Sequence, residues 1–356
     1  MNRLQPIANF LVILVFGAIV LIEGAFILVP LVWGVFFAFA LNPLSTWLEQ
    51  KRIPRGLAVF FSILLVGLIS FGIFYLLLNQ MVGLIKEIPE IGNNLQTKLS
   101  RYLEELSSLL GRDLLDPANE FSFLPTGDFN QALVETGKSV TLAGIVPLYT
   151  FLLIYYKDFF IEFLIRISSK NKDLILNWAQ DSGRVIQSYL VGMIRVTAIV
   201  AVLAGVFFYF LGIKYFILFA AFVAILNLIP FVGVFISSFF VILYVFLTTD
   251  SLFYPILTFA VLWGIQLFEN NIITPLVVGS KVKVNALAVI LAILLGGWLW
   301  GISGMVLFIP LVGVLKITLE RSNRLSPYAY LLGDDIPVTE ELENFWKLLR
   351  NKVLKK

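Results

Sequence analysis

The chain contains no cysteine and no histidine among its 356 residues, and only 14% of its residues are charged. Without these two residue types there is no disulfide, no zinc site built on thiolate or imidazole, and no Ser-His-Asp triad. Soluble domains carry roughly 25% charged residues, so the composition excludes an ordinary soluble enzyme. A net charge of +3 is too small to indicate nucleic-acid binding.

Long apolar runs take the place of the missing charge. A membrane-spanning helix needs about 20 mostly apolar residues to cross about 30 Å of hydrocarbon. The runs here are continuous and lack the period-two alternation of membrane barrel strands. The sequence therefore predicts an all-α polytopic membrane protein with about eight spans. The apolar runs are Ile7–Leu28, Pro30–Leu48, Leu57–Ile85, Val140–Tyr156, Val196–Leu211, Tyr215–Ile229, Val232–Leu247, Leu252–Val278 and Ala286–Leu319.

Composition divides the chain into four parts. Membrane helices at 1–85 precede a charged segment at 86–138, followed by a membrane core at 139–320 and a polar tail at 321–356. Apolar residues recur at steps of three and four between Ile88 and Leu109, which predicts a small amphipathic helix. This helix packs either on the protein's own surface or against another subunit. Lysine and arginine in the short loops place this segment outside the cell and both termini in the cytoplasm.

Two stretches leave the number of crossings open. Residues 214–249 and 285–319 each hold two apolar pieces that are short for a full span. Each stretch is either a tilted helical pair or a re-entrant hairpin. The glycine-rich run Gly296–Met305 lacks the Lys-Ser/Thr end of a phosphate-binding loop. We expect its glycines to allow close helix packing or to form a hairpin tip.

Three proline- and glycine-containing motifs predict interruptions in the membrane helices: Asn227–Gly233, Thr274–Gly279 and Ile309–Gly313. Such breaks are tolerated only where they are packed in protein or line a cavity. Ile229–Val234 and Ile309–Val314 match at all positions but one, through either a structural repeat or chance. Paired interruptions of this kind indicate a transporter's substrate site.

Polar side chains gather around the second motif. Gln266, Asn270 and Thr274 are spaced by four and share one helix face, beside the lone acid Glu269. A carboxylate within a membrane helix is costly and usually faces a cavity or a partner. Glu269 is thus a candidate coupling or gating group, unless it lies at the inner mouth and is simply solvated. The predicted transport path comprises Asn227, Pro230, Gly233, Gln266, Glu269, Asn270, Asn271, Thr274, Pro275, Gly279, Pro310 and Gly313.

These motifs resemble the autoinducer-2 exporter (AI-2E) family of bacterial permeases. The resemblance covers nearly the whole chain, and two positions depart from the family's pattern: Met193 replaces a frequent glutamine, and Ala286 a frequent proline. The matching motifs are Asn227–Gly233 with Pro230, Gln266–Asn270 followed by Pro275 and Gly279, Gly296–Met305 leading to Pro310, Tyr155–Asp158, and Tyr189–Gly192.

The resemblance implies a secondary transporter in the bacterial plasma membrane. Family members have been assigned export of the furanone signal autoinducer-2 or sodium/proton exchange, and the family implies a homo-oligomer, expected to be a pentamer. We therefore expect a proton- or sodium-coupled carrier of a small polar metabolite, signal molecule or ion. It would need no cofactor or metal and would not be an enzyme. The alternative is a non-transporting oligomeric scaffold that binds a partner in the membrane.

Overall fold

The computed structural model describes residues 4–110, 144–168, 172–230, 232–277, 284–322 and 324–334. Within these ranges the chain forms helices and turns without a strand, which confirms the all-α membrane class. Among the described residues, five helices are long and apolar enough to cross a membrane, judged by length and composition. The elements are α1 (Leu4–Glu23), α2 (Ala25–Gln50), α3 (Arg55–Leu110), the helix Gly144–Tyr155, α5 (Lys157–Ser168), α6 (Lys172–Phe210), α7 (Phe216–Leu226), α8 (Val232–Thr248), α9 (Phe253–Phe268), η1 (Glu269–Ile273), α10 (Thr274–Val277), α11 (Ala286–Glu320) and α12 (Ser326–Leu332).

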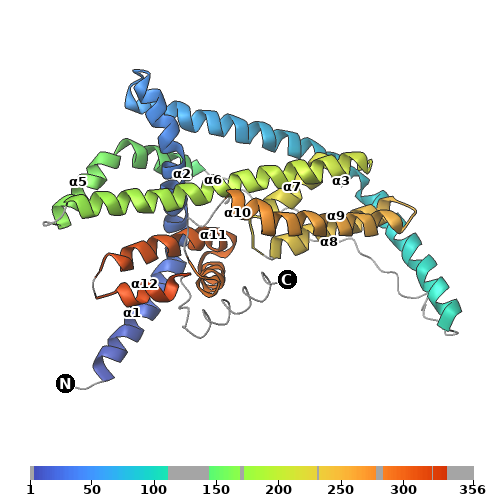
Figure 1. The fold of residues 1–356 in the computed structure, drawn as a ribbon. Helices are drawn as coiled ribbons and strands as arrows, with labels where there is room; N and C mark the ends of the chain where they lie inside the picture. Colours follow the sequence, from blue (N-terminus) through green and yellow to red (C-terminus); the bar gives the residue numbers. More distant parts are fainter. Residues whose placement is uncertain are drawn as a thin grey trace, which may run out of the picture.

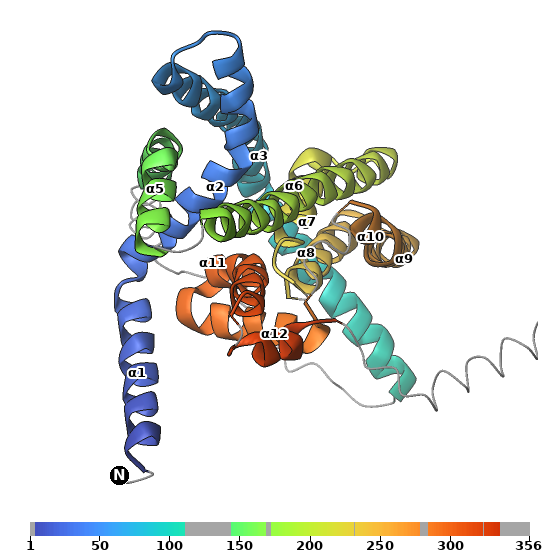
Figure 2. The same ribbon diagram turned by 60° about the vertical axis from the view of Figure 1, so that its left-hand side comes forward.

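Helices α1 and α2 follow one another end to end, with a bend at Gly24 (Figures 1 and 2). The Gly24 amide donates to the Val20 carbonyl at 2.9 Å, and the Leu28 amide to the Gly24 carbonyl at 2.9 Å, so helical bonding runs through the joint. The division into two separate apolar spans at this point is therefore wrong. Gly24 keeps right-handed helical angles, with φ −79° and ψ 0°, so the chain bends there without reversing.

Helix α3 is one element of 56 residues, about 84 Å long. It runs through the predicted boundary at residue 85 without a break and contains the predicted helix from Ile88 to Leu109. The packing of that helix's apolar stripe lies outside the described residues. In Figure 1 the far end of α3 projects well beyond the other helices.

Helix α6 is the axis of the remaining core. Its C-terminal half packs against the α7–α8 hairpin, which we define as Phe216–Thr248; Gly205 on α6 lies beside Ala220 of α7. The two arms pair in antiparallel order, because the ring of Phe219 lies 4.5 Å from that of Tyr244 and Phe222 lies 6.3 Å from Phe240. With 11 residues, α7 is about 17 Å long and too short to cross the hydrocarbon alone.

Helix α11 contains the second hairpin. Its backbone departs from helical angles at Trp300 and Gly301, where Gly301 adopts a φ of +59°. A Cβ on Gly304 would lie only 1.9 Å from the Gly296 carbonyl oxygen, so the two arms touch through bare backbone. This confirms the expectation that these glycines permit close packing at a hairpin tip. We call this element the α11 hairpin.

The predicted break at Pro310 is wrong. Pro310 and Gly313 lie buried within the helical second arm of α11. The chain reverses at Gly301 instead, because glycine tolerates the positive φ that the turn requires. The matching hexapeptides Ile229–Val234 and Ile309–Val314 consequently differ in conformation, and they are not a structural repeat.

The two hairpins lie along α6 from opposite ends. The second arm of α11 follows the N-terminal half of α6, since Tyr189 donates to the Val306 carbonyl and the Trp178 indole to Thr318. The α7–α8 hairpin follows the other half, with its base near the C-terminal end of α6 (Figure 1). The middle of α6, around Met193, is therefore where the hairpin tips converge.

Candidate substrate pocket at the middle of α6

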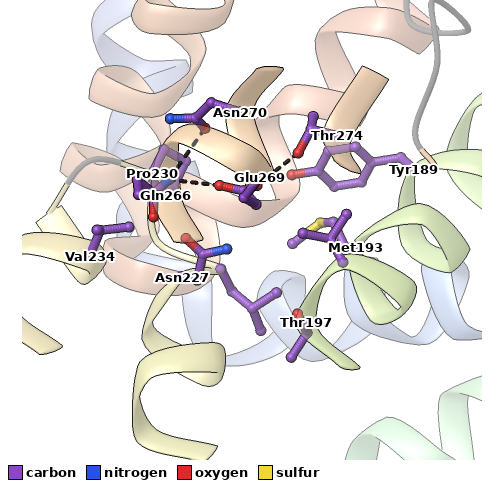
Figure 3. Close-up of a pocket in the computed structure, with 12 residues that line it drawn as sticks. Tyr189, Met193, Thr197, Asn227, Pro230, Val234, Gln266, Glu269, Asn270 and Thr274 are labelled. Carbon is purple, nitrogen blue, oxygen red and sulfur yellow. Dashed lines mark hydrogen bonds between the residues drawn. The ribbon is translucent and has the colours of Figure 1, made fainter. Parts of the chain in front are cut away.

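A pocket of about 490 Å³ opens where the tip of the α7–α8 hairpin meets α6 and the end of α9 (Figure 3). A volume of this size is typical of small-molecule sites. Its lining joins three segments of the chain: 189–197, 227–234 and 266–274. The residues are Tyr189, Met193, Val196, Thr197, Asn227, Leu228, Pro230, Val234, Gln266, Glu269, Asn270 and Thr274.

A π-helical turn shapes the acidic wall of the pocket. Glu269–Ile273 forms this wider turn between α9 and α10. Pro275 explains it: proline has no N–H for the carbonyl four residues earlier, and its ring collides with that carbonyl, so the preceding turn widens. The widening changes which side chains meet, because residues five apart come onto one face.

The π turn brings hydrogen-bond donors to Glu269. The Thr274 hydroxyl donates to one carboxylate oxygen at 2.7 Å, and the Gln266 amide donates to the other at 2.6 Å. The same Gln266 amide reaches the Asn270 side-chain oxygen at 3.3 Å. Glu269 is only 7% exposed, so its carboxylate is buried in this network and not solvated at a helix end. The π turn thus adds Glu269 to the polar face that spacing by four predicts.

The hairpin tip supplies the opposing wall. Asn227 caps α7 and lies below Gln266 and Glu269 in the view of Figure 3, with Pro230 beside them. The turn is tight: a Cβ on Gly233 would lie 1.7 Å from the Leu226 carbonyl oxygen. Only glycine fits at this position, so Gly233 shapes the tip without lining the pocket.

Helix α6 supplies a third wall that sequence reasoning missed. Tyr189, Met193 and Thr197 are spaced by four and face the pocket together (Figure 3). The Tyr189 hydroxyl donates to the Val306 carbonyl at 3.3 Å and so ties this wall to the α11 hairpin. Thr197, a hydroxyl within an otherwise apolar stretch, was the signal that could have identified this face.

Several predicted path residues lie elsewhere. Asn271 is exposed, does not line the pocket and donates to the Leu267 carbonyl at 2.7 Å. Pro275 acts on the backbone of the π turn and is not a lining residue. Pro310 and Gly313 belong to α11. Gly279 lies outside the described residues.

Hydrogen-bonding groups surround a single acid in this pocket. Amides from Asn227, Gln266 and Asn270 and the hydroxyl of Thr274 lie around Glu269, and no lysine or arginine is among the described residues of the lining. An anion would meet an uncompensated carboxylate, whereas an uncharged hydrogen-bonding solute or a cation would not. In the described ranges no group of three or more acidic residues could hold a metal ion.

Long apolar helices, two hairpins and a buried polar pocket define a multi-pass membrane transport protein. The model of the AI-2E transporter family matches residues 10–324, and the chain belongs to that family. A putative transport protein of Haemophilus influenzae is 28% identical, covering 87% of this chain and 91% of its own. Two proteins of Escherichia coli K12 are each 25% identical to this chain. They are the putative transport protein YhhT, covering 88% and 90%, and the AI-2 transport protein TqsA, covering 87% and 90%.

Proposed function

We propose that this protein is a secondary transporter whose substrate binds in the pocket at the middle of α6. The substrate is a small uncharged solute rich in hydrogen-bonding groups, or a cation. The buried carboxylate of Glu269 supports this proposal most directly, because an acid inside a membrane protein is costly to keep unless it serves a site. Its partners Gln266 and Thr274 hold it toward the opening that Asn227 faces.

The hairpin architecture supports the same function. The pocket wall includes the tip of the α7–α8 hairpin, and irregular backbone of this kind is stable in a membrane only where it is covered by protein or lines a cavity. Interrupted helices meeting at a polar site are the usual construction of transporter binding sites. Movement of the hairpin tip relative to α6 would open the pocket to one side of the membrane.

Coupling, membrane and assembly follow from the same proposal. Glu269 is the group that would bind a coupling proton or sodium ion together with the substrate. The relative named AI-2 transport protein motivates testing autoinducer-2 beside other small polar solutes. We place the protein in the bacterial plasma membrane as a homo-oligomer, a pentamer, with both termini in the cytoplasm. A counterflow screen of polar metabolites, sodium and protons in proteoliposomes would identify the substrate.

Flux through proteoliposomes tests the proposal. Glu269→Gln keeps the shape of the side chain and removes its charge, and we expect flux to fall by about tenfold or more because charge-assisted hydrogen bonds are lost. Asn271→Ala is the matched control. Its side chain is adjacent to this network in sequence, but among the described residues it bonds to the Leu267 carbonyl alone. Equal flux from Glu269→Gln and the unchanged protein would remove Glu269 from the mechanism.

A further inference from the structure

A second cavity, separate from the polar pocket, lies between α2, α3, the helix Gly144–Tyr155 and the tip of the α11 hairpin. Its volume is about 910 Å³, and none of the described residues that line it is ionisable. Phe37, Ile63 and Trp300 are typical of the lining. Two of the few polar groups there are already bonded to backbone. The Trp300 indole donates to the Leu21 carbonyl at 2.9 Å, and the Thr150 hydroxyl to the Val146 carbonyl at 2.8 Å.

The walls of this cavity are membrane helices. Both α2 and α3 are among the segments long and apolar enough to span a bilayer. An apolar cavity walled by membrane helices can accommodate acyl chains from the surrounding lipid. A polar solute would gain no hydrogen-bonding partner there and would lose its hydration.

Basic side chains stand at one end of the cavity. The lining residue Leu41 is followed by Asn42, whose side-chain oxygen accepts a hydrogen bond from the Lys157 ammonium at 3.1 Å. Arg55 lies at the same end, bonded to the Ile154 carbonyl and to Asp158, both at 2.6 Å. Within the described ranges, Lys157 has no carboxylate partner. Its positive charge therefore remains available to an anionic group.

We propose that this cavity binds an acyl chain of an anionic phospholipid, with the phosphate at Lys157. The apolar lining selects the chain, and the charge at the cavity's end selects the headgroup, as basic residues beside membrane helices commonly do. The bound chain would contact Trp300 and Ser303 at the tip of the α11 hairpin. Lipid would thus fill the space between that hairpin and the N-terminal helices.

Gly67 offers a way to fill the cavity without strain. It lines the cavity from α3, and a Cβ placed on it would meet no atom within 4 Å. Gly67→Leu should therefore occupy the space that the acyl chain takes. Gly72 is the matched control: it lies on the same helix with equally open surroundings, but it is not a lining residue.

Native mass spectrometry of the detergent-purified full chain with added phosphatidylglycerol or phosphatidylcholine tests the proposal. We expect the unchanged protein and Gly72→Leu to retain phosphatidylglycerol and Gly67→Leu to lose it. Lys157→Gln should bind the two lipids equally well. Equal lipid retention by the Gly67→Leu and Gly72→Leu variants would overturn the assignment.

A photo-crosslinking arm separates lipid from protein as the occupant. Benzoylphenylalanine introduced at position 67 should form adducts with the mass of a phospholipid when native membranes are irradiated. Crosslinks to a second copy of the chain would show that the cavity belongs to a subunit interface and would overturn the proposal. Neither measurement depends on transport, so their failure would leave the function proposed for the polar pocket untouched.

Discussion

The α7–α8 and α11 hairpins share a close glycine–carbonyl contact, but their tips lie in different surroundings. Each is closed by a glycine at which a Cβ would overlap a carbonyl oxygen: 1.7 Å from Leu226 for Gly233, and 1.9 Å from Gly296 for Gly304. The tips differ in chemistry. The first turns the Asn227 amide into a polar pocket, while the second places Trp300 beside an apolar cavity. Glycine thus makes the hairpin, and the tip side chains decide what it meets.

The bases of the hairpins are also held by different parts of the chain. Helix α3 holds the base of the α7–α8 hairpin: the Gln80 side chain accepts from the Leu218 amide at 2.9 Å, and Lys98 donates to carbonyls at the end of α8. Helix α12 holds the base of the α11 hairpin through Asn285. Each hairpin is therefore anchored at its base, and the two tips carry different side chains.

The largest effect is expected at the tip of the α7–α8 hairpin. Gly233→Ala puts a methyl group where the Leu226 carbonyl lies, so the turn must open or the helices must separate. We expect a loss of at least about 3 kcal/mol in the free energy of unfolding, or no folded protein at all. Thermal unfolding in detergent measures it. Gly264→Ala, with no atom within 4 Å of its added Cβ, should change little. Similar stability for both variants would contradict the tight turn.

A smaller effect is expected at the base of the α11 hairpin. The Asn285 side chain caps α11 by accepting from the Ala288 amide at 2.9 Å and donates to the carbonyls of Leu331 and Gly333. Asn285→Ala removes these bonds, which should cost about 2 kcal/mol and release α12. Faster tryptic cleavage at Arg324 would report that release. Cleavage at the unchanged rate would mean that other contacts hold α12.

The smallest of these effects is expected where α3 meets α8. Lys98 donates to the Phe246 carbonyl at 2.8 Å and also reaches the carbonyl of Thr249, so its ammonium caps the C-terminal end of α8. Lys98→Met should lower stability by about 1 kcal/mol. Lys86→Met, which changes an exposed lysine on the same helix, is the control in the same thermal assay. Identical unfolding of the two variants would show that Lys98 does not stabilise the end of α8.

Composition and the spacing of neighbouring residues made part of this structure predictable. Apolar runs and the low charge identified a helical membrane protein, and spacing by four placed Gln266, Asn270 and Thr274 on one face. The glycines around Gly301 indicated close helix packing or a hairpin tip. The structure also brings Asn227 to the same pocket, and its role in transport stays a prediction. Each of these inferences rests on side chains close together in sequence, where helical geometry alone fixes the neighbours.

The misses all depended on longer-range packing. The motifs at Pro230 and Pro310 differ at one residue of six, yet Pro230 lies in a turn and Pro310 in a helix, so local sequence does not decide their conformation. The α6 wall of the pocket was missed because only tertiary contacts reveal which face of an apolar helix meets the hairpin tips. The joining of α1 to α2 depends on a bend at Gly24 that composition does not distinguish from a reversal.

Water access to the polar pocket and to the apolar cavity tests the account most directly. Because the chain has no native cysteine, each introduced thiol is the only one present. Thr197→Cys places one thiol in the polar pocket, and Ser303→Cys places one in the apolar cavity. A charged methanethiosulfonate reagent needs a hydrated thiolate. We predict that it modifies Thr197→Cys in membrane vesicles and leaves Ser303→Cys unmodified. A Thr197→Cys thiol as inert as that of Ser303→Cys would contradict a hydrated substrate pocket at the middle of α6.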